Sequence, residues 1–78
     1  MTLDIDRLRA DVAEILEISP DEIADDDNLF DFGLDSIRLM MLGQRWRDAG
    51  ATVEFADLAE WPSLERWAEI VSQRAGGV

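Results

Sequence analysis

Apolar side chains recur at helical intervals from near the beginning of the chain. The first series comprises Ile5, Leu8, Val12, Ile15 and Leu16. Spacings of three and four residues place these side chains on one helix face, so they predict a helix over residues 5–16. Asp4 or Thr2 is placed to cap its beginning. The opposite face, which we expect to be solvated, carries Arg7, Arg9, Asp11, Glu14 and Glu17.

A second series predicts a helix from about Ser36 to Ala49 that ends at Gly50, because glycine is favoured just past a helix end. At 100° per residue the helix has two faces. The face assigned to the core carries Leu39, Leu42, Gly43 and Trp46, with Ala49 near its edge. The other carries Ser36, Met40, Gln44 and Arg47, flanked by Ile37 and Met41. We interpret Met40 as a surface residue and Met41 as a core residue.

Two further elements complete the predicted fold. Residues 51–55 lack helical spacing and are expected to form an extended linker, followed by a short helix from Ala56 to Glu60 capped by Asp57. Pro62 favours the start of a last helix from about Ser63 to Arg74. Its apolar stripe comprises Leu64, Trp67, Ala68, Ile70 and Val71. The pattern predicts an all-α fold, a small four-helix bundle of three main helices and one short third helix, forming a single domain over residues 1–78.

The segment between the first two long helices has its own local signals. Ser19-Pro20-Asp21-Glu22 has the form of a capping box with proline at the first helical position, so a short turn should begin there. The acidic run 25–28 is expected to be a solvated loop. It does not fit a calcium-binding loop, since the sixth and twelfth positions from Asp25 are Phe30 and Ser36 rather than Gly and Glu. The apolar side chains that follow should pack on the helices; they are Leu29, Phe30, Phe32 and Leu34.

Composition narrows the functional classes. The chain has 78 residues and contains neither Cys nor His, which rules out disulfides and the usual zinc sites, so we predict no metal site. Eighteen acidic and seven basic residues give a net charge of −11, which disfavours binding to nucleic acids and anionic membranes. No apolar run is long enough to span a membrane, and the amino terminus lacks the features of a signal peptide. We therefore expect a cytoplasmic domain that is monomeric in isolation.

The segment Gly33-Leu34-Asp35-Ser36 presents a serine at the start of a helix. Glycine permits a sharp turn, and Asp35 and Ser36 can accept hydrogen bonds from the first helical N–H groups. The positive end of the helix dipole favours a phosphate group at this position. The chain has no His, Cys, Lys or Tyr to activate the hydroxyl, so we expect a substrate of another enzyme rather than an enzyme.

Gly-Leu-Asp-Ser followed by a helix resembles the phosphopantetheine attachment site of the carrier-protein family. The resemblance extends over almost the whole chain, including Val53-Glu54-Phe55 and Trp61-Pro62-Ser63-Leu64. It implies an acyl-carrier-protein-like fold in which Ser36, flanked by Asp35 and Leu34, receives 4′-phosphopantetheine from coenzyme A. The cofactor's thiol then carries an acid as a thioester, which fits a chain without cysteine.

Within that family the chain is most similar to the aryl carrier domains of siderophore-type nonribosomal peptide assembly. Fatty-acid carriers have an acidic second helix, whereas no acidic residue occurs between Ile37 and Arg47 here. Peptidyl carriers usually have Gly or His where this chain has Leu34. Arg45-Trp46-Arg47 and the segment 55–59 add to the aryl likeness. The resemblance implies three partners: a phosphopantetheinyl transferase, an aryl-acid adenylating enzyme and a condensation domain.

Such partners must approach Ser36, so we predict an apolar partner surface around it with Arg38 and Arg47 at its rim. Its residues on the second helix are Ile37, Met40 and Gln44, and the family fold implies the addition of Phe55 and Ala59. Two alternatives stay open. The chain could be a peptidyl or acyl carrier of another nonribosomal peptide or polyketide pathway, or a helical docking domain whose serine is never modified.

Overall fold

The computed structural model describes residues 4–75, with side chains to residue 73, and all regular structure in that range is helical. The α-helices are α1 (Ile5–Leu16), α2 (Ser36–Asp48), α3 (Phe55–Glu60) and α4 (Leu64–Ala75). Two 3₁₀ turns, η1 (Pro20–Glu22) and η2 (Leu29–Phe32), lie between α1 and α2. The predicted fold class, three main helices and a short third one, is confirmed. No helix in the described range is long and apolar enough to cross a membrane.

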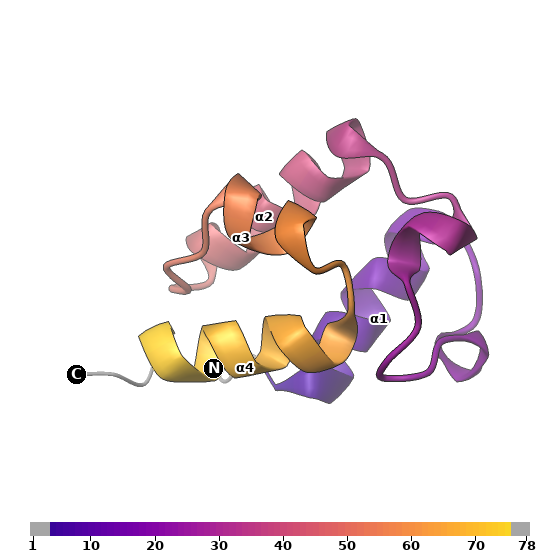
Figure 1. Ribbon diagram of the computed structural model, residues 1–78, viewed down its shortest axis with the longest axis horizontal. Helices are drawn as coiled ribbons and strands as arrows, with labels where there is room; N and C mark the ends of the chain where they lie inside the picture. The colour runs from indigo at the N-terminus through magenta and orange to yellow at the C-terminus, as the bar shows by residue number, and fades with distance from the viewer. Residues whose placement is uncertain (1–3, 76–78) are drawn as a thin grey trace.

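The four helices pack as two pairs, α1 with α4 and α2 with α3 (Figure 1). The two pairs meet at two buried tryptophans, Trp46 of α2 and Trp67 of α4, whose ring centroids are 5.6 Å apart in an edge-to-face arrangement. The indole N–H of Trp67 donates to the backbone oxygen of Leu58 in α3 at 3.0 Å. Five residues of the apolar faces predicted for α2 and α4 form a core set that is at most 1% exposed: Leu39, Leu42, Trp46, Leu64 and Trp67.

Asp11 of α1 is not on the solvated face to which the sequence assigned it. It is 6% exposed, and its carboxylate accepts a hydrogen bond from the indole N–H of Trp46 at 2.8 Å. The guanidinium groups of Arg7 and Arg45 also donate to it, each at 3.4 Å. Buried carboxylates persist when several donors satisfy them. Two of these donors come from α2, more than thirty positions away, which helical spacing within α1 cannot reveal.

Most of the helix caps agree with the predictions. Asp4 caps α1, its Oδ1 accepting the Arg7 N–H at 2.9 Å, while Thr2 lies outside the described residues. Prediction and structure differ at α3, which begins at Phe55 rather than Ala56. Asp57 therefore lies inside the first turn, where its carboxylate accepts the N–H of Glu54 at 3.0 Å instead of capping the helix from outside.

The other caps and helix ends lie within about one residue of their predicted positions. The predicted capping box at Ser19 is confirmed, with Glu22 accepting the Ser19 N–H at 2.8 Å. The last helix begins at Leu64, and Ser63 is its cap, its hydroxyl accepting the N–H of Arg66 at 3.3 Å. Ala49 follows the last residue of α2 and is exposed.

The segment before α2 packs less completely than predicted. Leu29 and Leu34 are buried and Phe32 packs partly against the core, but Phe30 is 41% exposed. The reason is the 3₁₀ turn, which repeats every three residues and so places Leu29 and Phe32 on the same side. Phe30 lies between them in sequence and points elsewhere.

Candidate functional site

The loop that leads to Ser36 is fixed at both ends by buried leucines. The N–H of Leu29 donates to the backbone oxygen of Pro62 at 2.9 Å, which ties η2 to the beginning of α4. Gly33 has a φ of 98°, a left-handed conformation that most other residues reach only with strain. The turn at Gly33 directs Leu34, 4% exposed, into the core. The backbone position of Ser36 is thereby set by packing on either side of the turn.

Ser36 is the first residue of α2 and is exposed. Asp35 precedes it as the cap, and its Oδ1 accepts the N–H of Arg38 at 2.9 Å. The other carboxylate oxygen accepts from the Arg38 guanidinium at 2.8 Å, so both oxygens of Asp35 are engaged. The N–H groups of Ser36 and Ile37 donate to no group within residues 4–75 and face the space beyond the helix end.

The chemistry that this arrangement offers is an accessible hydroxyl beside two unused N–H donors. Within the described residues no side chain hydrogen-bonds the Ser36 hydroxyl, and the neighbouring Asp35 is held by Arg38. A nucleophile of a hydrolase needs a base within hydrogen-bonding reach. The site can accept a group but does not itself supply activation.

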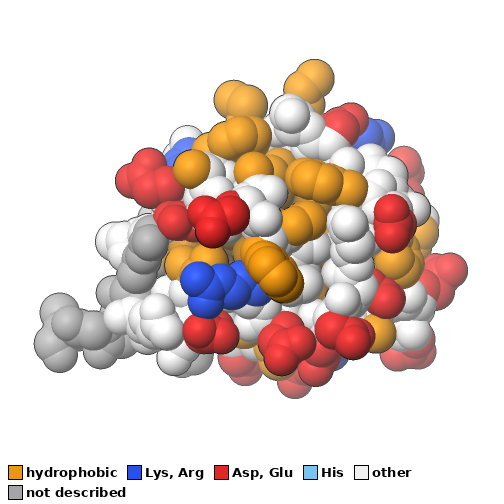
Figure 2. All heavy atoms as spheres, viewed as in Figure 1, with side chains coloured by type: hydrophobic (Ala, Val, Ile, Leu, Met, Phe, Trp, Pro, Cys, Tyr) orange, Lys and Arg blue, Asp and Glu red, His pale blue; other side chains and the backbone are white. Residues whose placement is uncertain are grey.

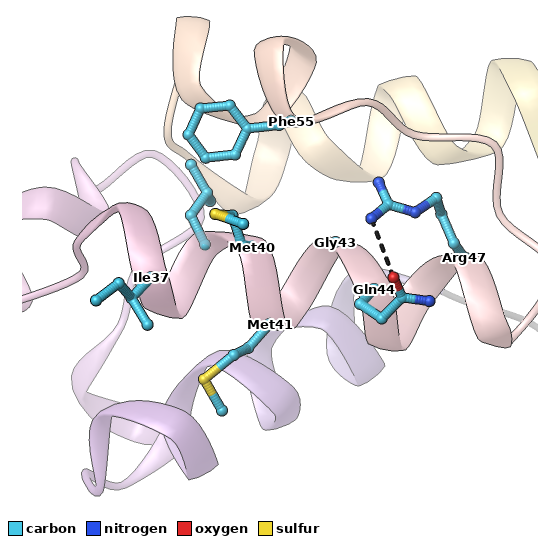
Figure 3. Close-up of a pocket in the computed structure, with 8 residues that line it drawn as sticks. Ile37, Met40, Met41, Gly43, Gln44, Arg47 and Phe55 are labelled. Carbon is cyan, nitrogen blue, oxygen red and sulfur yellow. Dashed lines mark hydrogen bonds between the residues drawn. The ribbon is translucent and has the colours of Figure 1, made fainter.

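An apolar groove of about 670 Å³ extends from this site along α2, bounded by α3 (Figure 3). Its lining residues are Ile37, Leu39, Met40, Met41, Gly43, Gln44, Arg47 and Phe55. Phe55 projects from α3 toward Met40 of α2. Four apolar side chains that line the groove are strongly exposed, at 72% for Ile37, 59% for Met40, 54% for Met41 and 41% for Phe55.

Four residues of the predicted partner surface therefore lie together along the groove, namely Ile37, Met40, Gln44 and Phe55. Ala59 does not line it; this side chain is half-buried and packs against the core. Figure 2 shows apolar side chains gathered along the upper edge, where Figure 1 places α2 and α3, and acidic side chains around much of the remaining face.

Met41 was predicted to be buried and is 54% exposed. It lies beside a smaller hollow of about 380 Å³ that is shared by α1 and α2 and also lined by Ile15, Asp35, Ile37 and Arg38. The α1–α2 contact is slight compared with the packing of α1 on α4, so this flank of α2 is left open. Sequence spacing gives the angle of Met41 on the helix but not how far the neighbouring helix reaches.

The two predicted rim arginines lie at opposite ends of α2. Arg38 lines the smaller hollow beside Ser36 and pairs with Asp35. Arg47 lines the far end of the groove, where its guanidinium donates to the backbone oxygen of Val53 at 3.1 Å and to Oε1 of Gln44 at 3.4 Å (Figure 3).

Comparison with known proteins adds an independent finding. Residues 6–71 match the protein family described as phosphopantetheine attachment site. Acyl carrier protein ScoB of Streptomyces coeruleorubidus is 45% identical over 75 residues, which cover 96% of this chain and 88% of that protein. Phenyloxazoline synthase MbtB of Mycobacterium tuberculosis is 46% identical over 69 residues, which cover 88% of this chain and 5% of the synthase.

Two further relatives are also much longer than this chain. Enterobactin synthase component B of Escherichia coli is 42% identical over 66 residues, which cover 85% of this chain and 23% of that protein. An isochorismatase of Bacillus subtilis is 41% identical over 70 residues, covering 90% of this chain and 22% of the relative. The chain thus spans less than a quarter of each of these two proteins.

Proposed function

Because the chain belongs to the phosphopantetheine attachment-site family, and is a carrier protein for 4′-phosphopantetheine, we propose that Ser36 is the residue that holds this group. The other serines serve this purpose less well. Ser19 and Ser63 accept backbone N–H groups as caps of η1 and α4, and Ser63 is also buried. Ser72 follows the matched residues 6–71. Ser36 is the one exposed serine in the matched segment whose hydroxyl caps nothing within the described residues.

The surroundings of Ser36 suit a phosphodiester. Its own N–H and that of Ile37 are unused within residues 4–75, and the beginning of a helix favours an anion. Asp35 stays bound to Arg38, so its negative charge is partly compensated beside the phosphate. Leu34 anchors the turn in the core. The cofactor supplies a thiol, which a chain without cysteine otherwise lacks.

Attachment requires a separate phosphopantetheinyl transferase. The Ser36 oxygen forms a bond to the β-phosphorus of coenzyme A, the pyrophosphate bond breaks, and adenosine 3′,5′-bisphosphate leaves. The serine proton passes to a base of the transferase, since no described side chain bonds the hydroxyl. Carriers of this family are generally non-catalytic, and we propose the same for this chain.

We further propose that the carried acid is an aryl acid such as a hydroxybenzoate. The support comes from the relatives: MbtB is named as a phenyloxazoline synthase, a name that includes a phenyl group, and the enterobactin synthase component is a further relative at above 40% identity. The acyl carrier protein ScoB matches this chain over 88% of its own length, which favours the alternative of an acyl carrier of another pathway. An unmodified docking domain has no comparable support.

Carrier domains of nonribosomal-peptide-type systems work with adenylating and condensing enzymes, and we propose these as partners here. The surface proposed for them comprises Ile37, Met40, Gln44, Phe55 and Ala59. The first four border one groove that begins within a turn of Ser36. Bulky exposed apolar side chains, methionine among them, suit a surface that meets several partners in turn.

Intact mass spectrometry tests the attachment site. After incubation with coenzyme A and a phosphopantetheinyl transferase, the chain should gain the mass of one phosphopantetheinyl group. Ser36→Ala should fold normally and gain nothing, whereas Ser72→Ala should be modified like the wild type. Modification of the Ser36→Ala protein would overturn the assignment. A second mass shift with a hydroxybenzoate, ATP and an aryl-acid adenylating enzyme tests the aryl cargo.

A further inference from the structure

Arg47 differs from the other arginines whose side chains the structure describes. Five of the six contact a carboxylate; these are Arg7, Arg9, Arg38, Arg45 and Arg66. No carboxylate of the described residues forms an ion pair with Arg47, although the chain has 18 acidic residues and a net charge of −11. Its two bonds, to Val53 and Gln44, go to neutral oxygens. A guanidinium carries five N–H donors, so three are left for another group.

Arg47 lies at one end of the groove. Ile37 and Arg47 border the groove ten residues apart on one helix, which is about 15 Å at 1.5 Å per residue. The guanidinium lies beside Gly43, since a Cβ at that position would be in ordinary van der Waals contact with Nη1 of Arg47, at 3.6 Å. The bonds to Val53 and Gln44 hold the guanidinium at the groove's end (Figure 3).

We propose that Arg47 is a partner-recognition residue that receives a carboxylate from an enzyme whose apolar side chains occupy the α2–α3 groove. This inference rests on the carrier function proposed above. Residues 36–47 of α2 include no acidic residue, so an approaching carboxylate meets none on this stretch of the helix. Asp48, the next one, is bound by the amide of Gln44 at 2.9 Å. The planar guanidinium matches a carboxylate with two parallel hydrogen bonds.

The test compares Arg47→Gln with Arg66→Gln, each of which removes one positive charge from an exposed arginine. Arg66 lies on α4 and pairs with Glu69, away from the groove. Both holo proteins are loaded by an aryl-acid adenylating enzyme, and KM for the carrier is measured at low and at high NaCl. Close interfacial charge pairs lead us to expect a KM about tenfold higher for Arg47→Gln at low salt. Arg66→Gln should stay within about twofold of wild type.

Salt dependence separates a direct charge contact from a merely structural role. The wild-type KM should rise with NaCl, and this rise should be much smaller in Arg47→Gln, because the screened contact is already gone. A KM for Arg47→Gln within twofold of wild type would overturn the proposal. Equal impairment of Arg66→Gln would do so too, as would a raised KM with an unchanged salt dependence, since that indicates displacement of the Val53 segment.

The proposal of an aryl cargo can fail without deciding the proposal about Arg47. If wild-type holo protein gains no aryl mass, the aryl cargo is wrong, and the same two variants are then compared with an adenylating enzyme that does load the wild type. The ratio of variant to wild type decides the role of Arg47 in either case. Thermal unfolding and near-UV circular dichroism of each variant confirm that the fold is retained.

Discussion

Both sides of α2 carry apolar side chains, but those on one side are buried and those on the other are exposed. Leu39, Leu42 and Trp46 on one side are at most 1% exposed, whereas Ile37 and Met40 on the other are 72% and 59% exposed. The difference does not come from the hydrophobicity of these five side chains, since all of them are apolar. It comes from what lies opposite: the inner side meets the packed helices, and the outer side borders an open groove. The exposure of Ile37 and Met40 beside Ser36 is the observation behind the proposed contact surface.

The largest expected loss of stability comes from a substitution on the buried side of α2. Trp46→Ala removes a fully buried indole that packs on Trp67 and binds Asp11. Such truncations cost about 3–5 kcal/mol, comparable to the whole net stability of so small a domain. The variant should be largely unfolded by far-UV circular dichroism. A cooperative thermal transition near that of wild type would show that the inner side of α2 contributes less than its burial indicates.

Substitutions at the junction between α1 and α2 should cause the next largest loss of stability. Asp11→Ala leaves the buried Trp46 N–H without its acceptor and takes a carboxylate from Arg7 and Arg45. An unsatisfied buried donor costs about 1–3 kcal/mol, so we expect a loss of about 2 kcal/mol in urea denaturation. Glu14→Ala is the matched control, because it removes an exposed carboxylate that also contacts Arg45. Equal losses for the two variants would contradict the role of burial.

Substitutions on the exposed side of α2 and on α3 should slow transfer of the aryl group rather than reduce the stability of the fold. Met40→Ala and Phe55→Ala should retain the fold and the phosphopantetheinyl modification, yet slow condensation of the loaded aryl group. Hot-spot truncations at interfaces cost about 2 kcal/mol or more, equivalent to a decrease of more than tenfold in kcat/KM. Glu69→Ala on α4 serves as the control. If the control slows condensation and the two groove variants do not, the partner surface lies elsewhere.

The smallest expected change concerns Met41, which sharpens the comparison because it was assigned to the core from its sequence position. At 54% exposure its replacement by Gln should alter the free energy of unfolding by no more than about 0.5 kcal/mol. Leu42→Gln, one residue later and fully buried, should be severely destabilised. A loss above 2 kcal/mol for Met41→Gln would mean that the flank of α2 facing α1 is closed in solution.

Sequence spacing was sufficient for the helices, for the five-residue core set and for the position of Ser36 at the beginning of α2, because each depends on local periodicity or capping. It was insufficient wherever a distant segment decides the outcome. Asp11 is buried by donors of α2, Met41 is exposed because α1 reaches little of that flank, and Phe30 is turned outward by a 3₁₀ repeat. The sequence placed Arg47 at the rim of the partner surface, but it could not show that no carboxylate of the described residues pairs with this guanidinium while the other described arginines each contact one.

The three tryptophans give the chain a built-in optical assay. Trp46 and Trp67 form a buried edge-to-face pair, while Trp61 is 64% exposed. Iodide should quench the Trp61 emission and leave the pair largely unaffected, so a single fluorescence titration distinguishes surface from interior signals. In a Trp61→Phe protein, the remaining emission reports on the meeting of the two helix pairs alone. Refolding of the domain can then be followed in real time without an attached dye.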